Sequence, residues 1–203
     1  MPTPNPSARP RPRNVGQTKQ RLLAAAVEEF AEHGLAGARV DRIAQRAGAN
    51  KRLLYVYFGN KDEVFDAVVD RCVSELSQAA PFDARDLPGY AGEVFDFLAG
   101  HPQTRRVLAW RDCERASPVA AEERAAAARL RAVRAAQRAG ELDAEIPALD
   151  LLALTDAIVH SWLGASVGLR SAGGADGDAP RRLRAHRRSV TEAVRRLSAV
   201  RRS

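Results

Sequence analysis

Apolar residues recur every three to four positions along most of this chain, which is the period of an amphipathic α-helix. The first clear stripe covers 22–30, with Gly34 after it as a helix stop, and a second covers 64–76. Further helical patterns, separated by breaks that contain Pro or Gly, occupy 87–100, 103–115, 118–139, 147–170 and 181–200. Period-two alternation never lasts more than a few residues. The sequence therefore predicts an all-α protein of about nine helices.

Between Gly34 and Lys61 the predicted helices are unusually short. The segment 40–47 makes two turns, Gly48 supplies the positive φ of a tight turn, and Asn50 is placed as an N-cap for a second short helix that begins at Lys51. Two short helices joined in this way are typical of a helix-turn-helix. We expect the packed side of this motif to consist of Ile43, Ala44, Leu54 and Phe58.

Charge is distributed unevenly along the 203 residues. Residues 1–61 hold eleven Lys/Arg against four Asp/Glu, and 181–203 hold nine Arg against one Glu. The middle, 62–180, is acidic, with twelve Lys/Arg against twenty Asp/Glu. Cationic ends indicate a polyanionic partner, either nucleic acid or an anionic membrane surface. For 181–203 the alternative is an Arg-rich helix face that is simply solvated.

Several classes of protein are disfavoured. Two cysteines are too few for a disulfide framework or a zinc site, and the chain has neither a signal peptide nor a long apolar segment. We therefore expect a soluble, cytoplasmic protein with no cofactor and no membrane partner. A helical enzyme is a remaining alternative, but no phosphate-binding loop, nucleophile elbow or metal-binding His pair is present.

The segment 18–69 strongly resembles the DNA-binding domain of the TetR family of transcriptional regulators. The matching elements are A-x-x-x-F-x-x-x-G (Ala26, Phe30, Gly34), I-A-x-x-A-G (Ile43, Ala44, Ala47, Gly48), L-Y-x-Y-F (54–58) and N-K-x-x-V (Asn60, Lys61, Val64). These motifs cover about a quarter of the chain. The rest is similar to the family only in being helical and of suitable length.

The resemblance implies a three-helix domain whose third helix lies in the DNA major groove. The residues implied to contact DNA are Arg39, Asn50, Lys51, Arg52, Tyr55, Val56, Tyr57 and Lys61. Lys51 and Arg52 would open the recognition helix, Val56 would face bases, and Lys61 would bind a phosphate. Ala38-Arg39 stands where the family commonly has a hydroxyl residue, so Arg39 replaces a hydroxyl–phosphate contact with a charged one or points to solvent.

The first fourteen residues alternate Pro with Arg and small polar residues, and this composition predicts a disordered basic arm over 1–14. For the rest of the chain the resemblance implies a helix-turn-helix domain over 15–61 and a helical ligand-binding and dimerisation domain over 62–203. The arm either enters a minor groove or adds non-specific attraction, and we favour the second. The predicted dimer interface uses 147–170 and 181–200, the latter through a stripe of Leu183, Val190, Val194 and Leu197.

A small-molecule effector would bind in the second domain, and aromatic, thiol and polar side chains are candidates for its pocket. These candidates, each of which could instead be ordinary core, are Phe65, Cys72, Tyr90, Phe95, Trp110, Cys113, Asp156, His160 and Trp162. Asp156 and His160 lie four residues apart and could form a polar pair, contact a ligand or bind a metal; pairing is the safer interpretation.

The predicted function is that of a homodimeric, sequence-specific DNA-binding transcriptional regulator and not an enzyme. Its partners would be a palindromic double-stranded operator and an unknown effector, which would make it a repressor that the effector releases. The alternative is an effector-independent or architectural DNA-binding protein. About 140 residues beyond the DNA-binding segment argue against it, because DNA binding alone would not need them.

Overall fold

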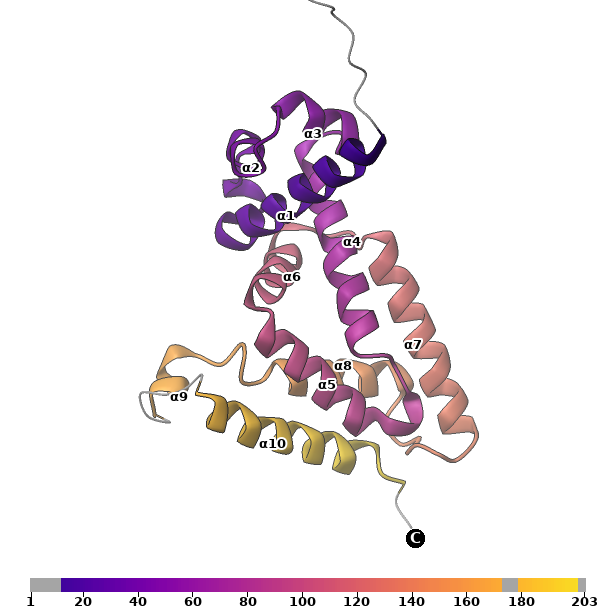
Figure 1. Cartoon of the computed structure of the whole chain (residues 1–203). Helices are drawn as coiled ribbons and strands as arrows, with labels where there is room; N and C mark the ends of the chain where they lie inside the picture. The colour runs from indigo at the N-terminus through magenta and orange to yellow at the C-terminus, as the bar shows by residue number, and fades with distance from the viewer. Residues whose placement is uncertain (1–11, 173–178, 201–203) are drawn as a thin grey trace, which may run out of the picture. The chain divides into compact units, whose positions relative to one another are not determined.

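The computed structural model describes residues 12–172 and 179–200, and these form ten α-helices and one short 3₁₀ helix (Figure 1). None of the residues in these two ranges lies in a strand, so the predicted all-α fold is confirmed. The helices are α1 (Pro12–Gly37), α2 (Val40–Arg46), α3 (Lys51–Phe58), α4 (Lys61–Ala79), η1 (Ala84–Asp86), α5 (Leu87–Gly100), α6 (Pro102–Glu114), α7 (Ala120–Arg138), α8 (Ala148–His160), α9 (Val167–Ala172) and α10 (Pro180–Ser198).

The helices group into two compact units. The first contains the described residues up to Val69 together with 106–116, and the second contains 70–105 with the described residues from 117 onward. The division of the chain at residue 61 stays a prediction. Most of the predicted basic arm, residues 1–11, lies outside the described residues, and α1 begins at Pro12, a residue type suited to the first turn of a helix.

The core of the first unit joins α1, α2, α3 and the start of α4. Phe30 of α1 and Phe65 of α4 meet edge to face with ring centroids 5.0 Å apart. Leu22, Ile43 and Leu54 are fully buried with them, so each of the four helices contributes a large apolar side chain. This packing fixes the two short helices, which would not be stable alone.

Gly34 is the point at which α1 changes direction. Its φ of 66° and ψ of −176° interrupt the helical geometry, and the helix resumes to end at Gly37. A Cβ atom at Gly34 would lie 2.9 Å from the Trp110 ring and 2.8 Å from the Glu114 carboxylate, both on α6. A residue without a side chain is therefore needed here both for its backbone angles and for the close approach of α6.

The second unit is built around α5, which packs against α8 and α10. Phe95, Leu98, Leu151, Val190 and Val194 fill this core, each at most 1% exposed. The stripe on α10 is therefore used inside its own unit. The prediction that Val190 and Val194 serve a dimer interface is wrong, because both already pack within the chain.

The single helix predicted over 147–170 is also wrong. The chain forms α8, leaves the helix after His160, and starts the short α9 at Val167. In the turn, the Ser161 hydroxyl donates to the carbonyl of Ile158, and the N–H of Gly164 donates to the carbonyl of His160 at 2.8 Å. Gly164, with its low helix propensity, stands within this break. No helix in the described parts of the chain is long and apolar enough to cross a bilayer.

Candidate nucleic-acid interface

The turn between α2 and α3 has the geometry that the sequence predicts. Gly48 has a φ of 57°, and the Asn50 side chain accepts a hydrogen bond from the Arg52 N–H at 2.8 Å. Asn50 is thus the N-cap of α3, as expected from its position. Leu54, which is fully buried, then holds α3 against the core. One face of this helix is anchored by these contacts.

The opposite face of α3 is open to solvent. Lys51 and Arg52 are exposed, Tyr55 is 46% exposed and Val56 is 67% exposed. Val56 is among the most exposed large apolar side chains of the described residues, and it lies beside the two cations on the same helix. Lys51 donates to Asp41 of α2 at 2.9–3.0 Å, and this hydrogen bond raises the pKa of Lys51. The four side chains together form a cationic, partly apolar surface.

The last turn of α3 is less exposed, and one prediction about it needs correction. Phe58 was expected to be a core residue, but it is only half-buried, with the Lys19 ammonium 5.3 Å from its ring centroid. A cation above an aromatic face at this distance is attracted to the ring, so Phe58 is covered by a polar side chain. Tyr57 is also half-buried.

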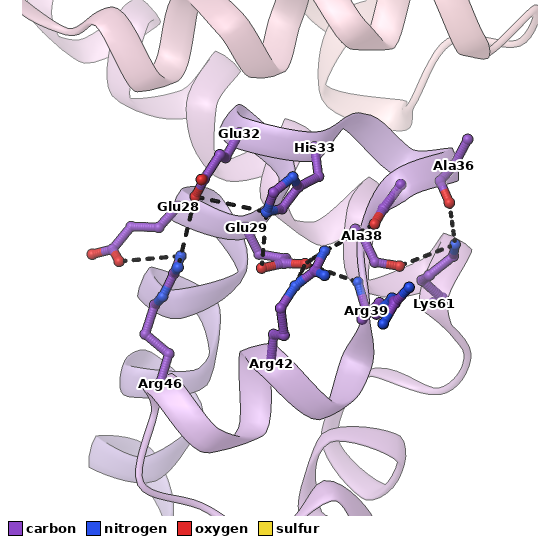
Figure 2. A network of polar contacts seen from close by, with 11 residues as sticks. Glu28, Glu29, Glu32, His33, Ala36, Ala38, Arg39, Arg42, Arg46 and Lys61 are labelled. Carbon is purple, nitrogen blue, oxygen red and sulfur yellow. Dashed lines mark hydrogen bonds and ion pairs between the residues drawn. The ribbon is translucent and has the colours of Figure 1, made fainter.

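Arg39 and the Lys61 ammonium both lie at the connection between α1 and α2. Arg39 is the N-cap residue of α2, but its side chain forms no capping bond and is exposed. The Lys61 ammonium lies 3.5 Å from the carbonyls of both Ala36 and Ala38, at the long limit of hydrogen bonding (Figure 2). Both cations are therefore available to an anion beside this connection.

A buried carboxylate supports this connection from α1. The Glu29 side chain is fully buried, and its Oε1 accepts from the Arg39 backbone N–H at 2.9 Å and from Arg42 Nε at 2.7 Å (Figure 2). Arg42 also donates to the carbonyl of Gly37 at 2.9 Å. Burial acts to raise the pKa of Glu29, but the hydrogen bonds from Arg42 and Arg39 and the nearby positive charges outweigh it, so its pKa lies below the ordinary value.

The start of α4 and the end of α6 hold the other side of this unit. Asn60 and Glu63 form a reciprocal capping box: Asn60 Oδ1 accepts from the Glu63 N–H at 3.0 Å, and Glu63 accepts from the Asn60 N–H at 2.7 Å. Glu114 of α6 accepts from the Leu35 N–H at 2.5 Å, just after the break at Gly34. Arg115 binds Asp62 and Asp66 of α4 at 2.7–3.0 Å.

Comparison with known proteins identifies this arrangement. Residues 22–68 match the model of bacterial regulatory proteins of the tetR family, and residues 86–196 match that of the tetracyclin repressor-like C-terminal domain. The chain is 42% identical over 152 residues to the HTH-type transcriptional repressor SCO4008 of Streptomyces coelicolor. The aligned region covers 73% of this chain and 79% of the relative. The chain belongs to the TetR family of transcriptional regulators.

Further similarities agree with this assignment. The crystal structure of SCO4942 from Streptomyces coelicolor matches with a TM-score of 0.78 and 38% identity, over 91% of this chain and 99% of that one. The HTH-type transcriptional repressor NicS of Pseudomonas putida is 29% identical over 106 residues, about half of each chain. The chain is thus a DNA-binding transcriptional regulator and not an enzyme, and regulators of this family bind DNA operators as dimers.

The predicted ligand-binding residues of this TetR-family chain are divided between the two units. Phe65, Trp110 and Cys113 belong to the first unit and the others to the second. Trp110 and Cys113 line a surface pocket of about 490 Å³ with Glu32 and Arg106. Phe65 is fully buried in the core of the first unit.

In the second unit, most of the candidates are core residues. Cys72, Tyr90, Phe95 and Trp162 are all at least nine-tenths buried, and burial raises the pKa of the Cys72 thiol to about 11. Trp162 carries the Arg182 guanidinium 4.0 Å from its ring centroid. The side chains of these four residues therefore serve chiefly to pack the unit.

The Asp156–His160 pairing prediction is wrong. His160 is exposed, and its Nδ1 contacts the backbone carbonyl of Asp156 at 2.8 Å and not the carboxylate. The Asp156 carboxylate instead binds the Arg129 guanidinium of α7 at 2.6 Å, a charge-assisted contact between two helices. In the residues that the structure describes, no three His, Cys, Asp or Glu side chains converge as a metal site.

Arg129 and Asp156 mark a cavity that the sequence did not predict. Its volume is about 310 Å³, and its remaining walls are apolar side chains of α7 and α8: Ala126, Ala127, Leu130, Leu149, Leu152 and Ala153. The Arg129 guanidinium also lies 5.4–5.5 Å from the ring centroids of Phe82 and Tyr90. A polar pair in an apolar cavity is a typical small-molecule site, although sequence spacing alone could not have joined α7 to α8.

Proposed function

We propose that this protein is a repressor that binds a palindromic operator as a homodimer and is released by a small-molecule effector. The observation that carries the proposal is the exposed face of α3, with Val56 67% exposed beside Arg52 and Tyr55. An α-helix fits the major groove, where an arginine can pair with guanine and an apolar side chain can contact the methyl group of thymine. Two recognition helices in a dimer would read two half-sites.

The cations around α3 support a docking geometry. Arg39 precedes the recognition helix in the chain and Lys61 follows it, and the Lys61 ammonium lies beside the α1–α2 connection that carries Arg39. Lys51 is the first residue of the recognition helix. Contacts of this kind to phosphates position a protein on DNA but carry no sequence information. We therefore assign the Arg39, Lys51 and Lys61 side chains and the Tyr57 hydroxyl to phosphates. Arg52, Tyr55 and Val56 are assigned to bases.

Two features of the second unit support a dimer and an effector. Leu149 and Leu154 of α8 are 63% and 44% exposed, which favours a partner on this helix. The cavity beside Arg129 and Asp156 has room for a small ligand, and its apolar walls favour an amphipathic one. An effector bound here would weaken operator binding only if it bound the DNA-free state more tightly.

The proposal is tested by selecting bound fragments from genomic DNA and measuring the affinity of the selected duplex by fluorescence anisotropy at several salt concentrations. We expect Tyr57→Phe and Lys61→Ala to weaken binding, and Lys61→Ala to reduce the salt dependence as well. Arg124→Ala is the matched control, because Arg124 is an exposed cation on α7 in the second unit. Equal affinities for all four proteins would refute the assignment of the DNA-binding surface.

The effector is tested with the same duplex and a library of small amphipathic compounds. A compound that raises the melting temperature of the free protein and releases the duplex supports a ligand-controlled repressor. Arg129→Leu should abolish that response while leaving operator affinity unchanged. A library that never alters affinity or melting temperature would favour the effector-independent DNA-binding protein.

A further inference from the structure

The N-terminus of α2 lacks the usual means of capping. A helix start is normally stabilised by a side-chain oxygen at the N-cap, and often by a Glu at the third helical position that accepts from the N-cap N–H. Here the N-cap is Arg39, which has no oxygen to offer, and the third position is Arg42, which has no acceptor. Neither half of a capping box can form from α2 itself.

Glu29 of α1 supplies the missing carboxylate. Its Oε1 accepts from the Arg39 N–H at 2.9 Å, which is the bond that a Glu at position 42 would make in a capping box. The same oxygen accepts from Arg42 Nε at 2.7 Å, so Arg42 joins the carboxylate to α2. Arg42 then reaches the carbonyl of Gly37, the last residue of α1. Figure 2 shows this chain of contacts across the α1–α2 connection.

Burying the Glu29 carboxylate costs more free energy than forming an ion pair at the surface. The Glu29 side chain is fully buried, and its Oε2 has no hydrogen-bond donor among the described residues, with His33 Nε2 3.9 Å away. A buried carboxylate with one unsatisfied oxygen is costly, and a carboxylate close to DNA also repels phosphates. Stability by itself would be served as well by a capping residue on α2.

The Glu29–Arg42 pair acts on the connection that carries two of the proposed phosphate contacts. It fixes the backbone of Arg39, and the Lys61 ammonium lies 3.5 Å from the carbonyl of Ala38, the preceding residue. The Arg39 side chain consequently takes no part in capping α2, and it extends into solvent from an anchored backbone. We infer that Glu29 is a positioning residue for DNA binding, which acts through Arg42 and the Arg39 backbone to hold the Arg39 guanidinium at a phosphate.

The inference rests on the proposed DNA-binding surface. It predicts that removing a negative charge from this surface weakens operator binding. Glu29→Gln removes a negative charge from the DNA-binding unit, which by electrostatics alone would tighten binding. Positioning predicts the opposite: operator affinity about tenfold weaker, as expected when a charge-assisted hydrogen bond is lost. The matched control is Glu28→Gln. Glu28 lies on the same helix, is 48% exposed and pairs with Arg46 at 3.5 Å, so its replacement changes the charge equally and should leave affinity unchanged or slightly higher.

A double-mutant cycle with Arg39→Ala separates positioning from a general loss of structure. The full chain is titrated into the selected operator duplex at a temperature where circular dichroism shows every variant folded. Arg39→Ala should weaken binding and lower the salt slope by about 0.9 per half-site. In that background Glu29→Gln should have no further effect, because its action passes through Arg39.

A second variant keeps the test decisive if Glu29→Gln fails to fold. Glu29→Leu combined with Arg42→Glu moves the carboxylate onto α2, where a Glu at the third position can accept the Arg39 N–H directly. We expect the double variant to bind the operator more tightly than the single variant Glu29→Leu, although the double variant is the more negatively charged protein.

The inference would be overturned by equal affinities for Glu29→Gln and Glu28→Gln, by a Glu29→Gln effect undiminished in the Arg39→Ala background, or by no rescue in the double variant. Wild-type affinity in Arg39→Ala would also overturn it while leaving the DNA-binding function intact, provided that Lys61→Ala still weakens binding. Failure of the unmodified protein to select any duplex would instead refute the proposed function.

Discussion

Replacing Gly34 with alanine tests how strictly the break in α1 requires a residue without a side chain. At a φ of 66° and a ψ of −176°, backbone angles that essentially only glycine adopts, an alanine costs ~1–3 kcal/mol relative to glycine. Its Cβ would lie 2.9 Å from the Trp110 ring and 2.8 Å from Glu114, and overpacking of this kind costs about 1–3 kcal/mol. The smaller entropy of the unfolded alanine chain returns about 0.4–1 kcal/mol. We therefore expect Gly34→Ala to lower the free energy of unfolding by roughly 1–5 kcal/mol.

Gly37→Ala is the matched control, three residues further along the same helix. Its φ is not positive, and a Cβ there would meet only the His33 Cβ at 3.4 Å. We expect this change to be neutral or to stabilise by up to about 1 kcal/mol.

The assay is urea unfolding followed by tryptophan fluorescence. The chain has two tryptophans, and in a Trp162→Phe background Trp110 alone reports on the first unit. The reasoning would be refuted if the free energies of unfolding of Gly34→Ala and Gly37→Ala differed by less than about 0.5 kcal/mol. A difference of that size is the ordinary scatter of a surface substitution.

Three further predictions concern the same unit and the thiols. Asn50→Ala should lower the free energy of unfolding of the first unit by about 1 kcal/mol, because alanine lacks the capping oxygen. Asn50→Ser retains an oxygen and should restore the stability, and urea unfolding of both variants measures the difference. Cys113 should react with a thiol reagent in the native protein and Cys72 only after unfolding, because Cys72 is buried and burial raises the pKa of its thiol to about 11. The rates are measured by mass spectrometry of the labelled peptides, and equal rates for the two thiols would contradict this expectation. The pKa of Glu29 lies below its ordinary value, so its stabilising effect is present above about pH 4.5 and is lost as the pH falls through the lowered pKa. Stability of the native chain should therefore fall more steeply under acid than that of Glu29→Gln, and parallel pH profiles in urea would contradict the expectation.

The sequence predicted the features that depend on neighbouring residues. Gly48 and Asn50 define the turn and the cap of α3 because a positive φ and an N-cap oxygen are local requirements. The buried position of Leu54 follows from helical spacing in the same way. These three residues were sufficient to place the exposed face of α3.

Features that join distant segments were missed or mistaken. Asp156 and His160 have the four-residue spacing of a helical pair, but the Asp156 carboxylate binds Arg129 of another helix. No local sequence pattern predicts this contact between two helices. Val190 and Val194 form an apolar stripe that fits either an internal core or a dimer interface, and periodicity cannot distinguish the two.

Glu29 is the exception, because the sequence did contain a signal for it. It follows Leu22 by seven residues and directly precedes Phe30, so it lies within the apolar stripe of α1 where a carboxylate is unexpected. A charged residue in such a stripe indicates a buried partner, since an unpaired buried charge is too costly. The partner, Arg42, could only be identified once α2 was placed against α1.

The most direct test of the DNA-binding surface is selection of operator sequences from a randomised duplex library by the native chain and by Val56→Ala. Recognition through the exposed face of α3 predicts that the native protein enriches a two-fold symmetric site, and that Val56→Ala loses its preference at one symmetric pair of positions while keeping the rest. Enrichment of an identical site by both proteins, or of no site by the native chain, would contradict the assignment of α3 as the recognition helix.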